Sequence, residues 1–122
     1  MGDQQQTQRQ RGKGQQKTHK LEITLRNNPG QGNGGRKGVV TPGHCTVKHK
    51  DRVTWEPKET DVRIHFPTEE LFNVREVEIA QGRSKTLTVS DNVRKGRYPY
   101  NIFCTETGDY AEGGSVPVMI VH

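Results

Sequence analysis

The most informative segment of this 122-residue chain for its fold is Cys45-Thr-Val-Lys-His-Lys-Asp-Arg-Val-Thr-Trp55. Cys45, Val47 and His49 occupy alternate positions up to Lys50-Asp51, and Val53 and Trp55 continue the same period beyond it. A period of two is typical of a half-buried β-strand, and a polar pair between two such runs is typical of a turn. The stretch therefore predicts strand, turn and strand, with Trp55 in the core.

The same period recurs on both sides of this stretch. Thr68 to Asn73 is the exception, and predicts one helical turn with Leu71 and Phe72 packed inward. Elsewhere, apolar residues alternate in short runs that are entered or left through Gly, Pro, Asp or Asn: Leu21 to Leu25, Val62 to Phe66, Val77 to Ile79, Leu87 to Val89, Tyr98 to Cys104 and Val116 to Ile120. No segment keeps a period of 3.6 over ten residues. About seven short strands predict an all-β, Greek-key antiparallel β-sandwich.

Composition divides the chain into a tail and a domain. Residues 1–19 are rich in Gln, Lys and Arg, and residues 27–38 are mostly Gly, Asn and charged. Neither stretch buries enough apolar area to offset about 1–2 kcal/mol of backbone ordering per residue. We therefore expect a disordered basic tail over 1–19, followed by a domain over 20–122 with a flexible glycine-rich loop at 27–38.

The formal charge follows the same division. Residues 1–40 carry eight Lys or Arg against two acids, a net of +6. Residues 41–122 carry eleven against twelve, a net of −1. The basic character of the chain is therefore expected in its first third, with the rest close to neutral.

Two motifs resemble those of the cupredoxin superfamily, the plastocyanin- and azurin-like sandwiches. Cys45 to Trp55 is similar to that family's strand, Gly-Asp-like turn and Val-x-Trp/Phe. Gly96-Arg-Tyr-Pro-Tyr100 is similar to the Gly-x-Tyr-x-Tyr/Phe that precedes the copper cysteine, and residues 116–121 match the usual last strand. The resemblance covers residues 39–122 and implies a cupredoxin-like fold.

Copper-binding members of that family hold the metal with a cysteine thiolate, two imidazoles and a weak axial ligand. Counted from the family's motifs, the first histidine is expected near Arg63 and the cysteine at Ile102. The resemblance therefore implies a cupredoxin-like domain that lacks the type-1 copper ligands. We expect no metal and no other cofactor.

A copper-binding electron-transfer protein is the alternative, with His65 and Cys104 as ligands. These two residues would serve only if both strands were shifted by two residues. Strand alternation also places His65 on the face opposite Ile64, and no histidine lies between Cys104 and His122.

Cys45 and Cys104 both fall on inward positions of their strands. A disulfide between them would close a loop of about 60 residues and add roughly 3–4 kcal/mol in an oxidising compartment. In a reducing compartment the two would stay buried thiols. The sequence leaves both alternatives open. His44, Cys45 and His49 match no closed zinc pattern.

The chain shows no paired acid and base and no local signature of a nucleophilic triad, so we expect a protein that is not an enzyme. The favoured function is a binding domain for a protein or other macromolecular partner. Loops at the ends of a sandwich often carry recognition, and Tyr110 is the one large side chain of the 105–115 loop. Arg63, His65 and Tyr110 are the expected contact residues.

Weak, non-specific nucleic-acid binding through the tail is a further alternative. The basic run would contact phosphates in a salt-dependent way, through Arg9, Arg11 and Lys13. No apolar run approaches the roughly 20 residues of a membrane span. The N-terminus has no apolar signal-peptide core, so the chain as written is expected in the cytoplasm, or outside it (secreted or periplasmic) if a signal peptide has been removed.

Overall fold

The computed structural model describes residues 16–27, 36–111 and 116–122. Within these ranges the chain forms eleven β-strands and no α-helix. The strands are β1 (Thr18–Asn27), β2 (Arg36–Thr41), β3 (His44–Val47), β4 (Arg52–Pro57), β5 (Val62–His65), β6 (Glu76–Ile79), β7 (Lys85–Thr88), β8 (Gly96–Pro99), β9 (Asn101–Cys104), β10 (Asp109–Tyr110) and β11 (Val118–Val121).

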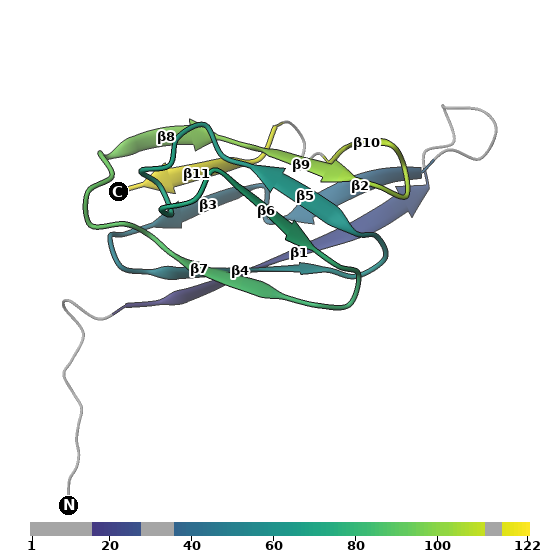
Figure 1. Cartoon of the computed structure of the whole chain (residues 1–122), viewed down its shortest axis with the longest axis horizontal. Coiled ribbons are helices and arrows are strands. Elements are labelled where there is room, and N and C mark those ends of the chain that lie inside the picture. The colour runs from purple at the N-terminus through teal and green to yellow at the C-terminus, as the bar shows by residue number, and fades with distance from the viewer. Residues whose placement is uncertain (1–15, 28–35, 112–115) are drawn as a thin grey trace, which may run out of the picture.

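The strands pack as two layers (Figure 1). One layer is sheet A, with the order β2-β1-β4-β7. The other combines sheet B (β3-β11-β8) and sheet C (β10-β9-β5-β6), because β8 and β9 are one run of chain interrupted only at Tyr100. The predicted all-β sandwich is confirmed.

Strand direction differs in part from the predicted antiparallel sandwich. β1 pairs in parallel with β4, and β11 pairs in parallel with β3, whereas the other described pairs are antiparallel. Alternation determines which face of a sheet a side chain occupies, but both strand directions leave the same face buried. The sequence pattern therefore predicts which side chains of these strands are buried, but not whether neighbouring strands run parallel or antiparallel.

Two strands begin earlier than the composition indicates. β1 starts at Thr18, inside the stretch predicted as tail, and β2 starts at Arg36, inside the predicted glycine-rich loop. Gly38 of β2 is buried, and a Cβ atom added there would lie 2.5 Å from the Cys104 Sγ. This glycine allows close packing between the two layers. The disorder expected at 1–15 and the flexibility expected at 28–35 lie outside the described residues.

Trp55 lies at the centre of an aromatic cluster between the layers, as predicted. Its side chain is fully buried, and its ring centroid lies 5.7 Å from that of Phe66, 5.4 Å from that of Phe72 and 6.2 Å from that of Tyr100. The Trp55 indole N–H donates a hydrogen bond of 3.3 Å to the Tyr100 hydroxyl. Offset and edge-on aromatic packing of this kind adds to the stability gained from burial alone.

The predicted helical turn between β5 and β6 is also present. The Asn73 N–H donates to the Glu69 carbonyl at 2.7 Å, the four-residue spacing of a single helical turn. Leu71 and Phe72 are buried beneath it. The turn therefore closes one end of the core.

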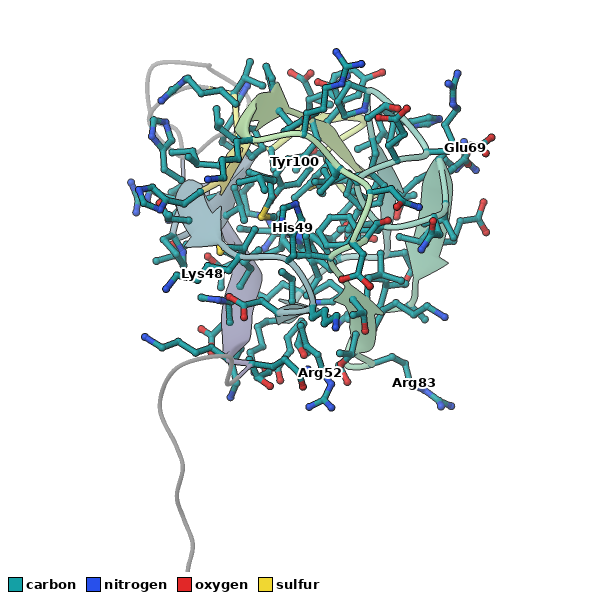
Figure 2. All side chains as sticks on the ribbon, turned by 90° about the vertical axis from the view of Figure 1, so that its left-hand side faces the viewer. Lys48, His49, Arg52, Glu69, Arg83 and Tyr100 are labelled. Atoms are coloured by element: carbon teal, nitrogen blue, oxygen red, sulfur yellow. The ribbon has the colours of Figure 1, made fainter. Side chains whose placement is uncertain are left out.

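The turn between β3 and β4 holds a buried carboxylate. Asp51 accepts hydrogen bonds of 3.0 Å from the backbone N–H groups of Lys17 and Lys48, and the His19 Nε2 lies 2.9 Å from a carboxylate oxygen. Burial raises the pKa of Asp51, but these hydrogen bonds and the attraction of His19 outweigh it and hold the pKa below its ordinary value. Asp51 thus fastens the start of β1 to the β3–β4 turn, whose Lys48, His49 and Arg52 are labelled in Figure 2.

Candidate functional site

The outer face of sheet C brings together the three residues expected to contact a partner. On β5, Val62 and Ile64 are buried and Arg63 and His65 are exposed. Ile64 lies opposite Ile102 of β9, and both side chains are fully buried. The phase of β5 is therefore the one that the alternation predicts, with the arginine and the histidine turned to solvent.

The strand register aligns these side chains in rows across the sheet. Tyr110 of β10 lies opposite Phe103 of β9, which lies opposite Arg63 of β5. Arg63 in turn lies opposite Glu78 of β6. In the next row, His65 lies between Asn101 of β9 on one side and Glu76 of β6 on the other. We call the outward side chains of these rows the interaction face: Arg63, His65, Glu76, Glu78, Phe103 and Tyr110.

Ion pairs order the charged half of the interaction face. The Arg63 Nε lies 3.1 Å from a Glu78 carboxylate oxygen and 3.3 Å from one of Glu76. The His65 Nε2 lies 3.1 Å from the other Glu76 oxygen. The side chains of Arg63 and His65 are 49% and 45% exposed, so these pairs add little to stability but keep both side chains in place.

An aromatic pair forms the other half. The rings of Phe103 and Tyr110 meet edge to face with centroids 5.3 Å apart, and Tyr110 is 50% exposed. A shallow pocket of about 440 Å³ opens beside the face and is lined in part by Arg63, Glu78 and Thr105. Tyrosine and arginine, both present here, are among the residues that most often dominate protein interfaces.

Two features of this face differ from what the sequence predicts. Tyr110 was expected on an end loop, but Asp109–Tyr110 is a strand that pairs with β9. Phe103 was not singled out, although it stands between the inward Ile102 and Cys104 and so had to point outward. Residues 112–115 of the predicted loop lie outside the described residues.

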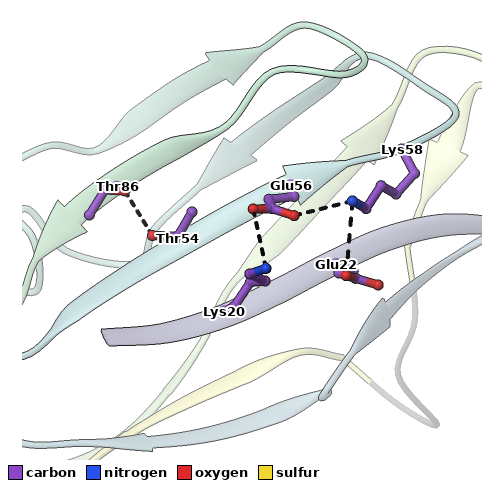
Figure 3. A network of polar contacts seen from close by, with 6 residues as sticks. All are labelled: Lys20, Glu22, Thr54, Glu56, Lys58 and Thr86. Atoms are coloured by element: carbon purple, nitrogen blue, oxygen red, sulfur yellow. Dashed lines mark hydrogen bonds and ion pairs between the residues drawn. The ribbon is translucent and has the colours of Figure 1, made fainter. Parts of the chain in front are cut away.

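The outer face of sheet A is different in character. Glu56 forms ion pairs with Lys20 at 3.8 Å and with Lys58 at 3.2 Å, and Lys58 also lies 3.9 Å from Glu22 (Figure 3). The Thr54 and Thr86 hydroxyls share a hydrogen bond of 2.7 Å. This face consists of mutually compensated charges and hydroxyls, with no aromatic ring among the residues drawn, so it serves as a comparison surface for the interaction face.

Both cysteines are free thiols in the structure, so the disulfide alternative is not formed. Cys45 lies on β3 opposite Met119, and Cys104 lies on β9 opposite Val62. Burial raises the pKa of each thiol to about 11, with the Asp51 charge adding to the shift at Cys45 and the Asp109 charge at Cys104. Both thiols are therefore protonated and poor nucleophiles at neutral pH.

The donor set around Cys104 does not fit a type-1 copper centre. Its Sγ is packed near Gly38, its strand partner is Val62, and both Val62 and Ala111 are buried. His65 stands on the opposite side of the sheet and pairs with Glu76. No group of three His, Cys, Asp or Glu side chains converges on a metal position within the described residues.

Three further histidines, His19, His44 and His49, lie elsewhere in the described structure. His19 contacts Asp51, and the His49 Nε2 lies 2.7 Å from the Val93 carbonyl oxygen. His44 is exposed at the start of β3, whereas Cys45 beside it is buried. His44, Cys45 and His49 are therefore not brought together as one donor set.

Solved structures of similar architecture support the fold. A reduced Cu(I) form of a proline-to-glycine mutant of amicyanin aligns with 93% of this chain and 87% of its own, with a TM-score of 0.51 and 16% identity. The multicopper oxidase Fet3p aligns with 85% of this chain, also with a TM-score of 0.51, at 18% identity. This chain spans only 22% of the oxidase.

Comparison of the sequence alone finds no related protein. No family model matches the chain, and no curated protein matches it significantly. The chain has a cupredoxin-like fold, as the sequence motifs imply. Among the described residues, no helix is long and apolar enough to cross a membrane.

Proposed function

We propose that this protein is a non-enzymatic, cupredoxin-like domain that binds a protein partner through the interaction face and carries no type-1 copper site. The observation that carries the proposal is the row from Tyr110 through Phe103 to Arg63, which the register of three neighbouring strands aligns on one exposed face. Tyr and Arg are enriched among the residues that contribute most to protein binding.

The chemistry of the face supports a protein partner. The aromatic pair offers an apolar surface, and the edge-to-face contact between its two rings holds both of them in place. Arg63 and Glu78 supply both charge signs beside it, and the adjoining pocket can receive one protruding side chain. Protein interfaces combine aromatic residues and arginine with polar and charged groups, as this face does.

The alternatives have less support. Electron transfer through copper requires His65 and Cys104 to bind the same ion. His65 lies on the outer face of sheet C, whereas Cys104 lies on its buried face. The phosphate contacts expected from Arg9, Arg11 and Lys13 lie outside the described residues.

A double substitution tests the interaction face. The protein with Arg63→Glu and Tyr110→Ala should lose affinity for its partner by about thirtyfold or more, because each residue is placed as a dominant contact. Immobilised wild-type chain would first capture proteins from an extract of its native host. Titration calorimetry with each purified candidate would then compare the wild type and the variant.

A matched variant controls for changes of charge and surface. Arg26→Glu and Thr88→Ala alter exposed positions of sheet A and should leave the same affinity unchanged. Equal thermal unfolding of all three proteins would show that the fold is kept. If every captured protein binds the interaction-face variant as tightly as the wild type, the face is not the binding surface.

A further inference from the structure

Exposed cations gather at one end of the sandwich. They lie on three segments: Lys17 before β1, residues 48–52 of the β3–β4 turn, and residues 89–97 that lead into β8. Together these segments carry Lys17, Lys48, Lys50, Arg52, Arg94, Lys95 and Arg97, against two acids, Asp51 and Asp91. We call the seven cations the basic end.

Hydrogen bonds hold the three segments side by side. The Arg52 N–H donates to the Lys17 carbonyl at 2.8 Å, and the Lys50 N–H donates to the Val89 carbonyl at 2.9 Å. The contact of His49 with the Val93 carbonyl ties the turn to the 89–97 segment a second time. Figure 2 views the molecule from this end, with Lys48 and Arg52 on it.

The cations of the basic end are not neutralised by neighbours. All seven are exposed, and none takes part in an ion pair among the described residues. Elsewhere in the domain, Lys58 and Arg63 each contact two carboxylates. Asp51 contributes one negative charge at this end but forms no ion pair with any of the seven cations, because its oxygens contact His19 and two backbone N–H groups.

Glu69 and Glu70 of the β5–β6 turn lie at the same end, because the Ser90 N–H donates to the Leu71 carbonyl there. The seven cations still outnumber these two acids together with Asp51 and Asp91, so a near-neutral domain presents a net positive surface at this end. Other acids lie on other elements, such as Glu56 of β4, Glu78 of β6 and Asp109 of β10. Several unpaired cations on one surface raise the local potential and attract polyanions. Each phosphate that a cation neutralises also releases condensed counterions, which drives binding to nucleic acids.

We propose that the basic end binds the phosphate backbone of double-stranded nucleic acid. In the part of the chain that the structure describes, the exposed large hydrophobic side chains are Tyr110 and Val116, on β10 and just before β11, not among the seven cations. The basic end thus lacks an exposed ring on which single-stranded bases stack, and an apolar side chain to enter a membrane. Cations alone suit a duplex, whose phosphates are regularly spaced along its surface.

A charge-neutralised variant of the full chain tests this proposal. The protein with Lys48→Gln, Arg94→Gln and Lys95→Gln should bind a fluorescein-labelled DNA duplex of about 20 base pairs about tenfold or more weakly than the wild type at about 0.1 M salt. The slope of log K against log salt should fall by about 2 to 3, because three phosphate contacts are lost. Fluorescence anisotropy measures both quantities.

The matched control changes net charge equally at the opposite end. Arg26→Gln, Arg83→Gln and Lys85→Gln alter exposed cations that form no ion pair within the described residues, and this variant should bind the DNA like the wild type. Equal weakening in both variants would mean that net charge alone attracts DNA and would overturn the proposal. So would unchanged binding by the first variant, or binding only to vesicles that contain phosphatidylserine.

Discussion

Replacing Trp55 by alanine should lower the free energy of unfolding by about 3–5 kcal/mol, the range for removing a large aromatic side chain from a packed core. Trp55 is fully buried and packs against Phe66, Phe72 and Tyr100. The substitution also leaves the Tyr100 hydroxyl buried without its indole partner, which adds to the cost. Urea unfolding followed by far-ultraviolet circular dichroism measures the change.

The neighbouring residue supplies the control for Trp55. Thr54 points to the outer face of sheet A and contacts Thr86 there, so Thr54→Ala should cost no more than about 1 kcal/mol. A cost below about 1 kcal/mol for Trp55→Ala would contradict the placement of the indole at the centre of the core.

Removing the Asp51 carboxylate should lower the free energy of unfolding by about 3 kcal/mol at about pH 7. This is the size of effect expected when buried donors lose a charged acceptor. Asp51→Ala leaves two backbone N–H groups and the His19 ring without their acceptor at a buried position. Because the folded-state pKa of Asp51 is lowered, its contribution is fully present above the unfolded-state pKa of about 4 and is lost as the pH falls through the folded-state value.

The pH dependence separates this role from a general loss of packing. The difference in unfolding free energy between wild type and Asp51→Ala should shrink when the pH is lowered from about 7 to about 2.5. Asp61→Ala is the matched control, since that residue is exposed, although it accepts one hydrogen bond from the Gln81 N–H. A wild-type advantage that stays constant down to acid pH would show that the charge of Asp51 does not stabilise the fold.

The sequence predicted burial well and spatial convergence poorly. Period-two alternation correctly placed Ile64 and Ile102 inside and Arg63 and His65 outside, because strand phase is a local property. The alignment of Tyr110 with Arg63 depends on the pairing of β10, β9 and β5. Register and sheet order arise from contacts between residues distant in sequence. No local sequence pattern therefore predicts the row of Tyr110, Phe103 and Arg63.

Two further features were hidden for other physical reasons. Composition places Gly38 in a glycine-rich loop, whereas in the structure its missing side chain makes room for the Cys104 sulfur. The basic end was hidden by averaging, since residues 41–122 sum to nearly zero charge although the two signs are unevenly distributed: they are paired on the faces of sheets A and C, and cations are in excess at the basic end. Summed charge describes a surface only when both signs are evenly mixed.

Strand phase keeps His65 and Cys104 on opposite sides of sheet C, and addition of copper is the test of that placement. One equivalent of Cu(II), or of Cu(I) followed by oxidation, should produce no intense thiolate-to-copper charge-transfer band in the visible spectrum of the full chain. An intense band that disappears in the Cys104→Ser variant would show a copper–thiolate site and contradict the account.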